Sequence, residues 1–406
     1  LPNSVAIRGA SASTYTREYF TYTGIDASGN PTGLTPMGPG PVSANGEYGI
    51  APDNKTFGPT DLKSQYQYEM ILGFDKTLGS DWAYGAKFTY RQLGTVIDDI
   101  CFEGAPNIIN DKIDAMGLDS SKYATDDPGC RIFNPNSTND YLVNSTTGGQ
   151  PVKVSVTQAD VGMPHVQRDY CGVDLYLSQA FDGKWYGRID YTFTRGFGNT
   201  EGQVRSDFGQ EDVSKTEDWD SWQLMDGQYG EFCNVRKHQI KFRGDYEISP
   251  EWLVSATLLV QSGMPKECLG YFGPYTQGPD GYDPGGANDP TGYNNYGTGN
   301  YHWCNGQRVT PGSIGHTPWT EMLNLGVHYR PAFADNKLGF NLDIMNALNQ
   351  QRAVQVDPSY QSGFADPDPT DPTSDPRGTL ITNNYYGQPL YTTPPRTVRL
   401  SVTYDY

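Results

Sequence analysis

The chain has 406 residues, of which 36% are hydrophobic and 19% charged, and its formal net charge is −18. This acidic balance argues against a nucleic-acid partner, because phosphate binding needs clustered Lys and Arg. No run of about 18 apolar residues occurs, which excludes a transmembrane helix but not membrane strands, since these are short and alternate. The chain starts at Leu1 without a signal-like segment, so we expect a mature product or a fragment lacking its start.

Strict alternation of apolar and polar residues predicts nine antiparallel strands, since successive side chains leave opposite faces of a strand. In the last segment Val398, Leu400 and Val402 share one face, and Arg399 and Ser401 share the other. A tenth strand-like segment precedes residue 24. The predicted strands are 66–77, 83–97, 168–180, 186–196, 237–248, 253–261, 321–330, 338–346 and 396–406.

Short and long connections alternate along the chain. The first eight regular strands form four hairpins with short turns, and polar stretches of 40 to 70 residues separate the hairpins. Long structureless loops argue against an ordinary compact domain. Outer-membrane barrels are the exception, because they combine short periplasmic turns with long extracellular loops. The polar stretches are about 98–165, 198–236, 262–319 and 347–395.

Aromatic residues lie in or beside the short turns, as in the interfacial girdle of a membrane barrel. These residues are Trp82, Trp185, Trp252 and Phe333. A soluble sandwich is the alternative, with its charged faces in water and its apolar faces buried, but it does not explain the alternating loop lengths. We therefore predict an all-β, antiparallel transmembrane barrel in the bacterial outer membrane, with the C-terminus in the periplasm.

The six cysteines are well separated and contain no CxxC pair, which argues against a zinc site. All lie in the long loops or at the outer ends of strands, where an oxidising compartment favours disulfides. The simplest connectivity pairs Cys101 with Cys130 and Cys268 with Cys304, each bond stabilising by roughly 3–4 kcal/mol. That leaves a bond from Cys171 to Cys233, which would tie two loops together.

Two loop segments are candidate binding sites. One is a run of carboxylates that could offer oxygen ligands to Ca²⁺, although its four prolines fit an extended, solvated loop equally. The other is an aromatic loop that could stack on a sugar or peptide or bind a surface protein, or else pack on neighbouring loops. The carboxylates are Asp366, Asp368, Asp371 and Asp375, and the aromatic residues are Tyr271, Phe272, Tyr275, Tyr282, Tyr293, Tyr296, Tyr301 and Trp303.

Enzymatic and metal motifs are missing from the sequence. There is no GxSxG elbow, no HExxH and no assignable Ser/His/Asp set. A ten-stranded outer-membrane protease is the enzymatic alternative, but no segment resembles its site, so we expect no enzyme and no cofactor beyond the candidate Ca²⁺. His238 and His328 lie on predicted strands, where packing is the expected role. The other histidines are His165, His302 and His316.

Several segments resemble TonB-dependent receptors. Residues 341–349 (NLDIMNALN) resemble the Asp-x-x-Asn-x-Phe/Leu-Asn segment before the last loop of those receptors. Residues 395–404 resemble their closing Pro-Arg-x-x-x-Leu-Ser-Val-x-Tyr strand. Residues 61–66, 82–91 and 318–320 are similar to the Oar-like branch. The resemblance covers most of the chain from about residue 60 to the end, and the order and spacing of the segments match the family.

The resemblance implies a 22-stranded barrel with an N-terminal plug and a TonB box. Only about ten strands and no plug are present, so residues 1–406 look like the C-terminal portion of such a barrel. The implied function is uptake of a ligand across the outer membrane, with the TonB system acting through a missing N-terminal part and with membrane lipid and lipopolysaccharide around the barrel. The alternative is a structural or adhesive surface protein whose loops bind partners.

Overall fold

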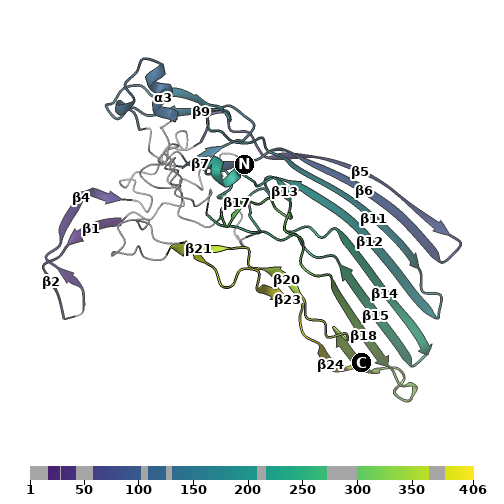
Figure 1. The fold of residues 1–406 in the computed structure, drawn as a ribbon. Helices are drawn as coiled ribbons and strands as arrows, with labels where there is room; N and C mark the ends of the chain where they lie inside the picture. Colours follow the sequence, from purple (N-terminus) through teal and green to yellow (C-terminus); the bar gives the residue numbers. More distant parts are fainter. Residues whose placement is uncertain are drawn as a thin grey trace.

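The computed structural model describes residues 17–27, 29–42, 58–101, 108–124, 130–207, 216–271, 300–364 and 380–406. A 10-stranded antiparallel sheet dominates it (Figure 1). Nine strands follow one another in chain order from one edge to the other, and the tenth, β13, extends the pairing at the end of β12. The strands are β5 (Tyr66–Leu78), β6 (Trp82–Thr95), β11 (Arg168–Gln179), β12 (Trp185–Gly198), β13 (Gly230–Glu231), β14 (His238–Ser249), β15 (Trp252–Gln261), β18 (Thr320–Tyr329), β19 (Leu338–Met345) and β24 (Thr397–Tyr404).

All nine predicted regular strands are confirmed, with ends that differ from the prediction by at most two residues. The alternation of apolar and polar residues predicted these strands correctly, because one face of the sheet is apolar along its whole width. Across β11, β12 and β14, for example, Leu175 pairs with Tyr191, which pairs with Ile240. We call this side the apolar face and the opposite side, which carries the charges, the charged face.

Large side chains of the apolar face are exposed rather than packed. Phe74 is 57% exposed, Leu175 43% and Leu400 79%. A soluble sandwich would bury these side chains against a second sheet, and no second sheet covers them in the described residues. The sandwich alternative therefore does not fit the structure. No helix among the described residues is long and apolar enough to cross a membrane.

Aromatic residues cluster where the short turns lie. The rings of Trp82 and Trp185 meet edge to face at 5.9 Å, and those of Trp252 and Tyr329 stack at 4.3 Å. Phe333, in the 3₁₀ turn Ala332–Ala334 between β18 and β19, is 81% exposed. This arrangement has the form of an interfacial girdle.

The sheet is open, because β5 and β24 form its two edges and do not pair with each other. Every residue of β5 is exposed. The expected additional strand before residue 24 does not join the sheet: β1 (Arg17–Thr21) pairs instead with β4 (Thr35–Val42), and β2 (Gly24–Ile25) with β3 (Pro31–Thr32). The described part of that segment, Arg17–Thr21, is therefore not a barrel strand, and residues 1–16 lie outside the described residues.

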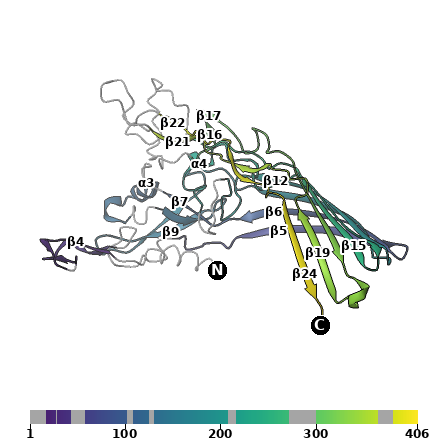
Figure 2. The ribbon, with the colours of Figure 1, turned by 90° about the horizontal axis from the view of Figure 1, so that it is seen from below.

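The long connections contain a folded unit, which we call the loop cap and define as the described parts of residues 96–167, 199–237, 262–319 and 346–396. Figure 2 shows the long strands extending away from it, with the C-terminus at the far end of β24. The expectation that these stretches lack regular structure is wrong. The elements of the loop cap are β7 (Asp98–Cys101), α3 (Ile108–Ala115), a 3₁₀ turn (Ser120–Lys122), β8 (Cys130–Phe133), β9 (Asn139–Val143), β10 (Val152–Val156), α4 (Trp222–Met225), β13 of the main sheet, β16 (Trp303–Cys304), β17 (Gln307–Arg308), β20 (Ala353–Val356), β21 (Gln361–Phe364), β22 (Leu380–Thr382) and β23 (Pro389–Thr392).

The loop cap holds the main hydrophobic core of the described residues. Helix α3 contributes Ile109 and Ile113, one turn apart, and the β9–β10 hairpin contributes Tyr141 and Val154, which are register partners. Trp219, from the connection between β12 and β14, closes the same cluster. Three segments far apart in the sequence therefore share one core.

Candidate functional site

The charged face of the sheet carries cross-strand ion pairs. Lys87 Nζ lies 3.1 Å from Asp174, and Arg399 Nη2 lies 2.9 Å from Asp343. A hollow of about 480 Å³ lies on this side and is lined in part by Asp75, Asp174 and Arg188. Such a surface suits water and polar solutes rather than lipid.

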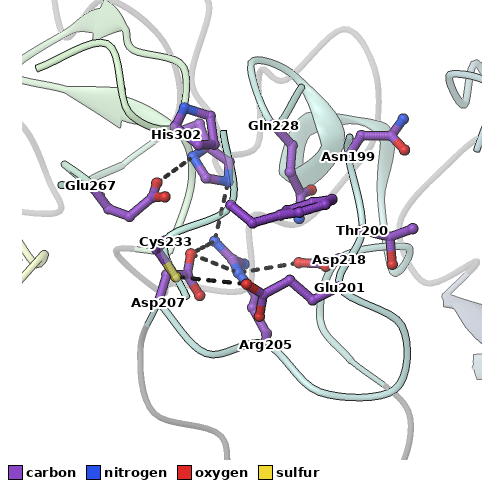
Figure 3. Close-up of a pocket in the computed structure, with 12 residues that line it drawn as sticks. Asn199, Thr200, Glu201, Arg205, Asp207, Asp218, Gln228, Cys233, Glu267 and His302 are labelled. Carbon is purple, nitrogen blue, oxygen red and sulfur yellow. Dashed lines mark hydrogen bonds and ion pairs between the residues drawn. The ribbon is translucent and has the colours of Figure 1, made fainter. Parts of the chain in front are cut away.

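A second cluster of charges is buried in the loop cap around Arg205 (Figure 3). Arg205 Nε and Nη2 donate to Asp207 Oδ2 at 3.0 and 2.9 Å. Arg205 Nη2 also donates to the carbonyl oxygen of Asn300 at 2.9 Å, and Nε lies 3.1 Å from Asp218 Oδ1. One guanidinium therefore joins two carboxylates and a distant backbone segment.

Negative charge exceeds positive charge in this cluster. Arg205 is the cation lining the cavity, which also has four acidic residues. Burying unpaired carboxylates is costly, because the charged form loses its hydration. The acidic residues are Glu201, Asp207, Asp218 and Glu267.

The burial shifts several pKa values in the cluster. Burial raises the pKa of Asp218 to about 7, although Arg205 opposes the shift. Burial, with Asp207 nearby, raises the pKa of Glu267 well above its usual value. Burial would lower the pKa of Arg205, but Asp207 and Asp218 outweigh it and raise that pKa. Burial, reinforced by Arg205, lowers the pKa of His302 well below its usual value, so its imidazole is neutral.

Glu267 and His302 face each other across the cavity without a hydrogen bond. Glu267 Oε2 and His302 Nδ1 are 3.6 Å apart, and neither atom has a hydrogen-bond partner in the described residues. Both side chains are at least 95% buried by exposed area. Ligand atoms of Asp207, Glu267 and His302 all lie within 4.8 Å of one another, which is the spacing of a metal-binding group.

The chain positions Glu267 and His302 through a disulfide beside them. Cys268 and Cys304 are bonded, which confirms that predicted pair. Glu267 precedes Cys268 directly, and His302 lies two residues before Cys304. Gly270 and Tyr301 also exchange backbone hydrogen bonds of 3.0 and 3.1 Å, so the two segments are fixed side by side.

The remaining cysteines divide into two cases. Cys101 and Cys130 are register partners across β7 and β8, so their backbone placement supports the predicted bond, which stays a prediction. The bond from Cys171 to Cys233 is wrong, since both are free thiols. Cys171 lies on β11, opposite Arg195, whereas Cys233 in the loop cap contacts Ser206 at 3.1 Å.

The predicted binding loops are only partly described. Tyr271 and Tyr301 are 5% and 1% exposed, so they pack inside the loop cap and do not form an open stacking surface. Trp303 is half-buried and donates its Nε1 hydrogen to Asp226 at 3.1 Å. The other aromatic residues and the Ca²⁺ candidates lie outside the described residues: Phe272, Tyr275, Tyr282, Tyr293, Tyr296, Asp366, Asp368, Asp371 and Asp375.

Sequence reasoning missed the buried cluster. Histidine spacing did not find His302, because Asp207 comes from another connection and Glu267 lies far from His302 along the same one. The predicted bond between Cys268 and Cys304 was a usable signal, since it brings Glu267 close to His302. His238 and His328 lie on strands, where each contacts a side chain across the sheet: Tyr191 at 2.9 Å and Asn341 at 2.8 Å respectively.

The chain is similar in sequence to a bacterial transporter. The chain is 24% identical over 372 residues, or 85% of its length, to the TonB-dependent transporter Oar of Myxococcus xanthus. This confirms the resemblance inferred from the motifs. The match spans 29% of that relative's length. No protein-family model matches the chain.

Two outer-membrane proteins of Escherichia coli are among the solved structures that align with the chain. The outer membrane transporter YddB from Escherichia coli aligns over 85% of this chain and 33% of its own, with 13% identity and a TM-score of 0.41. The ferric-catecholate import receptor Fiu from E. coli aligns over 96% of this chain and 40% of its own, with 9% identity and a TM-score of 0.39.

Proposed function

We propose that this chain forms the C-terminal part of the β-barrel of a TonB-dependent outer-membrane receptor, which takes up a ligand across the outer membrane. The observation that carries the proposal is the similarity to the Oar transporter over 85% of the chain. The open sheet is consistent with a partial barrel. An open edge is not stable in lipid, so β5 and β24 require further strands beside them.

The sheet supports a membrane position for the proposed receptor. The nine long strands have 8 to 14 residues, close to or above the roughly 9 to 11 that cross a bilayer when tilted. The apolar face would contact membrane lipid and the outer-leaflet lipopolysaccharide, and the charged face would line the lumen. The short turns and the C-terminus would lie in the periplasm, and the loop cap would lie outside the cell.

We infer no enzymatic step. The relative is named as a transporter, and the buried cluster of the loop cap lacks an accessible nucleophile, since Cys233 is engaged by Glu201 and Ser206. Burial, with Glu201 nearby, raises the pKa of the Cys233 thiol well above its usual value, which disfavours the reactive thiolate.

The test of receptor function is coupling to TonB. The complete gene product, purified in detergent, should bind the periplasmic domain of TonB from the same organism, and deletion of the region upstream of Leu1 should abolish binding. The proposal would be contradicted if the complete protein contains no plug domain and does not bind TonB. That result would favour a structural or adhesive surface protein, in which the barrel only anchors the loop cap.

A further inference from the structure

Three buried side chains in the loop cap form a group that the proposed transport function does not use. They are Asp207, Glu267 and His302, whose ligand atoms lie within 4.8 Å of one another. Two atoms of these side chains, Glu267 Oε2 and His302 Nδ1, are buried without a hydrogen-bond partner in the described residues. Buried polar atoms normally have a hydrogen-bond partner or a metal ion. Two such atoms that face each other without a partner therefore indicate that both bind a further atom or ion.

We propose that Asp207, Glu267 and His302 bind one divalent transition-metal ion of the Zn²⁺ type, which joins two of the long connections in the loop cap. The geometry fits such an ion. Two ligands of a tetrahedral zinc, each roughly 2.1 Å from it, lie roughly 3.4 Å apart. Glu267 Oε2 and His302 Nδ1 are 3.6 Å apart, which is too long for a hydrogen bond but close to this ligand spacing.

The ligand types favour a transition metal over Ca²⁺ or Mg²⁺. One imidazole nitrogen with two carboxylates is a set that Zn²⁺ accepts, whereas Ca²⁺ takes six to eight oxygen ligands and Mg²⁺ keeps several waters in an octahedral shell. The adjoining cavity measures about 30 Å³. It has space for a water as fourth ligand but not for a full hydration shell.

Arg205 does not block binding through His302 Nδ1. A metal at Nδ1 requires the imidazole proton at Nε2, which lies 3.4 Å from Arg205 Nη2. The two hydrogens of Nη2 already have closer acceptors, Asp207 Oδ2 and the carbonyl oxygen of Asn300, both at 2.9 Å. The contact with His302 is therefore the weakest of the three, and it can open without leaving Nη2 unsatisfied.

The charges of the cluster also favour a cation. Its four acidic side chains face a single guanidinium, and two of them, Glu201 and Glu267, have no ion pair to Arg205 among the described contacts. A divalent ion at Glu267 would supply positive charge where the cavity lacks it. Buried charges are stable when they are paired or coordinate a metal.

The bound ion would cross-link parts of the loop cap that the disulfide leaves separate. The bond between Cys268 and Cys304 already joins the segments of Glu267 and His302. Asp207 belongs to the connection between β12 and β14, which the disulfide does not reach. Metal binding would therefore attach this connection to the disulfide-linked pair.

The test is a Zn²⁺ titration of the whole protein purified in detergent, stripped with a chelator and dialysed. We expect one equivalent of Zn²⁺ by mass spectrometry of the metal and in competition with a chromophoric chelator. Glu267→Gln and His302→Gln should each lower the affinity more than about tenfold, because removal of a ligand exceeds the effect of an outer-shell change. Ca²⁺ or Mg²⁺ at the same concentration should not displace Zn²⁺.

The matched control is His316→Gln. His316 Nε2 lies 3.1 Å from Glu231 in an exposed pair, which is where adventitious Zn²⁺ would bind. This variant should keep the full equivalent. The proposal is wrong if the wild type binds no Zn²⁺, if Glu267→Gln and the wild type bind equally, if His316→Gln removes the equivalent, or if Ca²⁺ displaces it.

A measurement on the wild type alone avoids any folding defect of the variants. Co²⁺ in place of Zn²⁺ should give the absorption of a nitrogen and oxygen site without a thiolate charge-transfer band. Cys233 lines the same cavity, but its sulfur is directed to Ser206 and Glu201. A thiolate band would contradict the assigned ligand set. This inference does not depend on TonB binding, so either proposal can fail without the other.

Discussion

The sheet and the loop cap place the same kind of side chain in opposite environments. On the sheet Phe74 is 57% exposed on the apolar face, whereas Phe133 in the loop cap is fully buried. Charged side chains differ between the regions in the same way: Lys87 and Asp174 form a solvent-accessible pair on the sheet, whereas Arg205 is buried among carboxylates in the loop cap. The sheet thus requires an apolar solvent around it, while the loop cap supplies its own interior.

The difference indicates what stabilises each region. The sheet is held by backbone pairing across its width, and its apolar side chains gain stability only when lipid covers them. The loop cap is held by a hydrophobic core, a disulfide and a buried charge cluster. The same type of substitution should therefore change stability by different amounts, depending on the environment in which its side chain lies.

The largest effect is expected in the core of the loop cap. Phe133→Ala should lower the free energy of unfolding of the loop cap by about 3–5 kcal/mol, because it empties a fully buried site. Phe74→Ala is the matched control and should leave that free energy nearly unchanged. Hydrogen exchange of the peptide covering residues 130–156 measures both. Equal effects of the two changes would contradict the separation of the regions.

A charge placed on the apolar face should be the next most costly. Leu258→Arg puts a guanidinium in lipid and should destabilise the folded protein in bilayers by about 2–4 kcal/mol at midplane depth. Thr257→Arg, on the neighbouring residue of β15 but on the charged face, should cost little. Urea unfolding in lipid vesicles compares them. A larger loss for Thr257→Arg would reverse the assignment of the two faces.

The pH dependence of the loop cap should depend in part on Asp98. Burial, together with Asp99, raises the pKa of Asp98 well above its usual value, against hydrogen bonds from Thr216. The folded state then holds a proton that the unfolded state releases, so stability should fall as the pH rises from about 4 through the raised pKa. Asp98→Asn should remove this fall.

The control for that profile is Asp140→Asn. The pKa of Asp140 is lowered by hydrogen bonds from Lys153 and Ser155, so its stabilisation is present above its unfolded pKa and lost toward acid. Asp140→Asn should change only the acid side of the profile. Hydrogen exchange of the loop cap between pH 4 and 8 distinguishes the two variants. An unchanged neutral-pH slope in Asp98→Asn would refute the assigned role of Asp98.

The cysteine pattern can be tested without any change in stability. Peptide mapping under non-reducing conditions should recover Cys268 linked to Cys304, and Cys101 linked to Cys130. Cys171 and Cys233 should be alkylated once the protein is denatured. Linkage between these last two would contradict the structure.

The sheet was predictable from sequence because one rule, alternation with period two, held over each of its nine long strands. The loop cap was not, because its elements are short and its core joins residues from separate connections. Val152–Val156 alternates clearly (VKVSV), yet five residues inside a polar stretch gave too weak a signal. The buried cluster depends on contacts such as Arg205 with Asn300, which no local pattern encodes.

In the proposed receptor, the loop cap and the short turns lie on opposite sides of the outer membrane. Ser80→Cys in the β5–β6 turn and Gln150→Cys in the β9–β10 turn place exposed thiols at the two ends. A membrane-impermeant maleimide on intact cells should label Gln150→Cys above the parent background, and should label Ser80→Cys only after the outer membrane is permeabilised. Equal labelling of both on intact cells would contradict this topology.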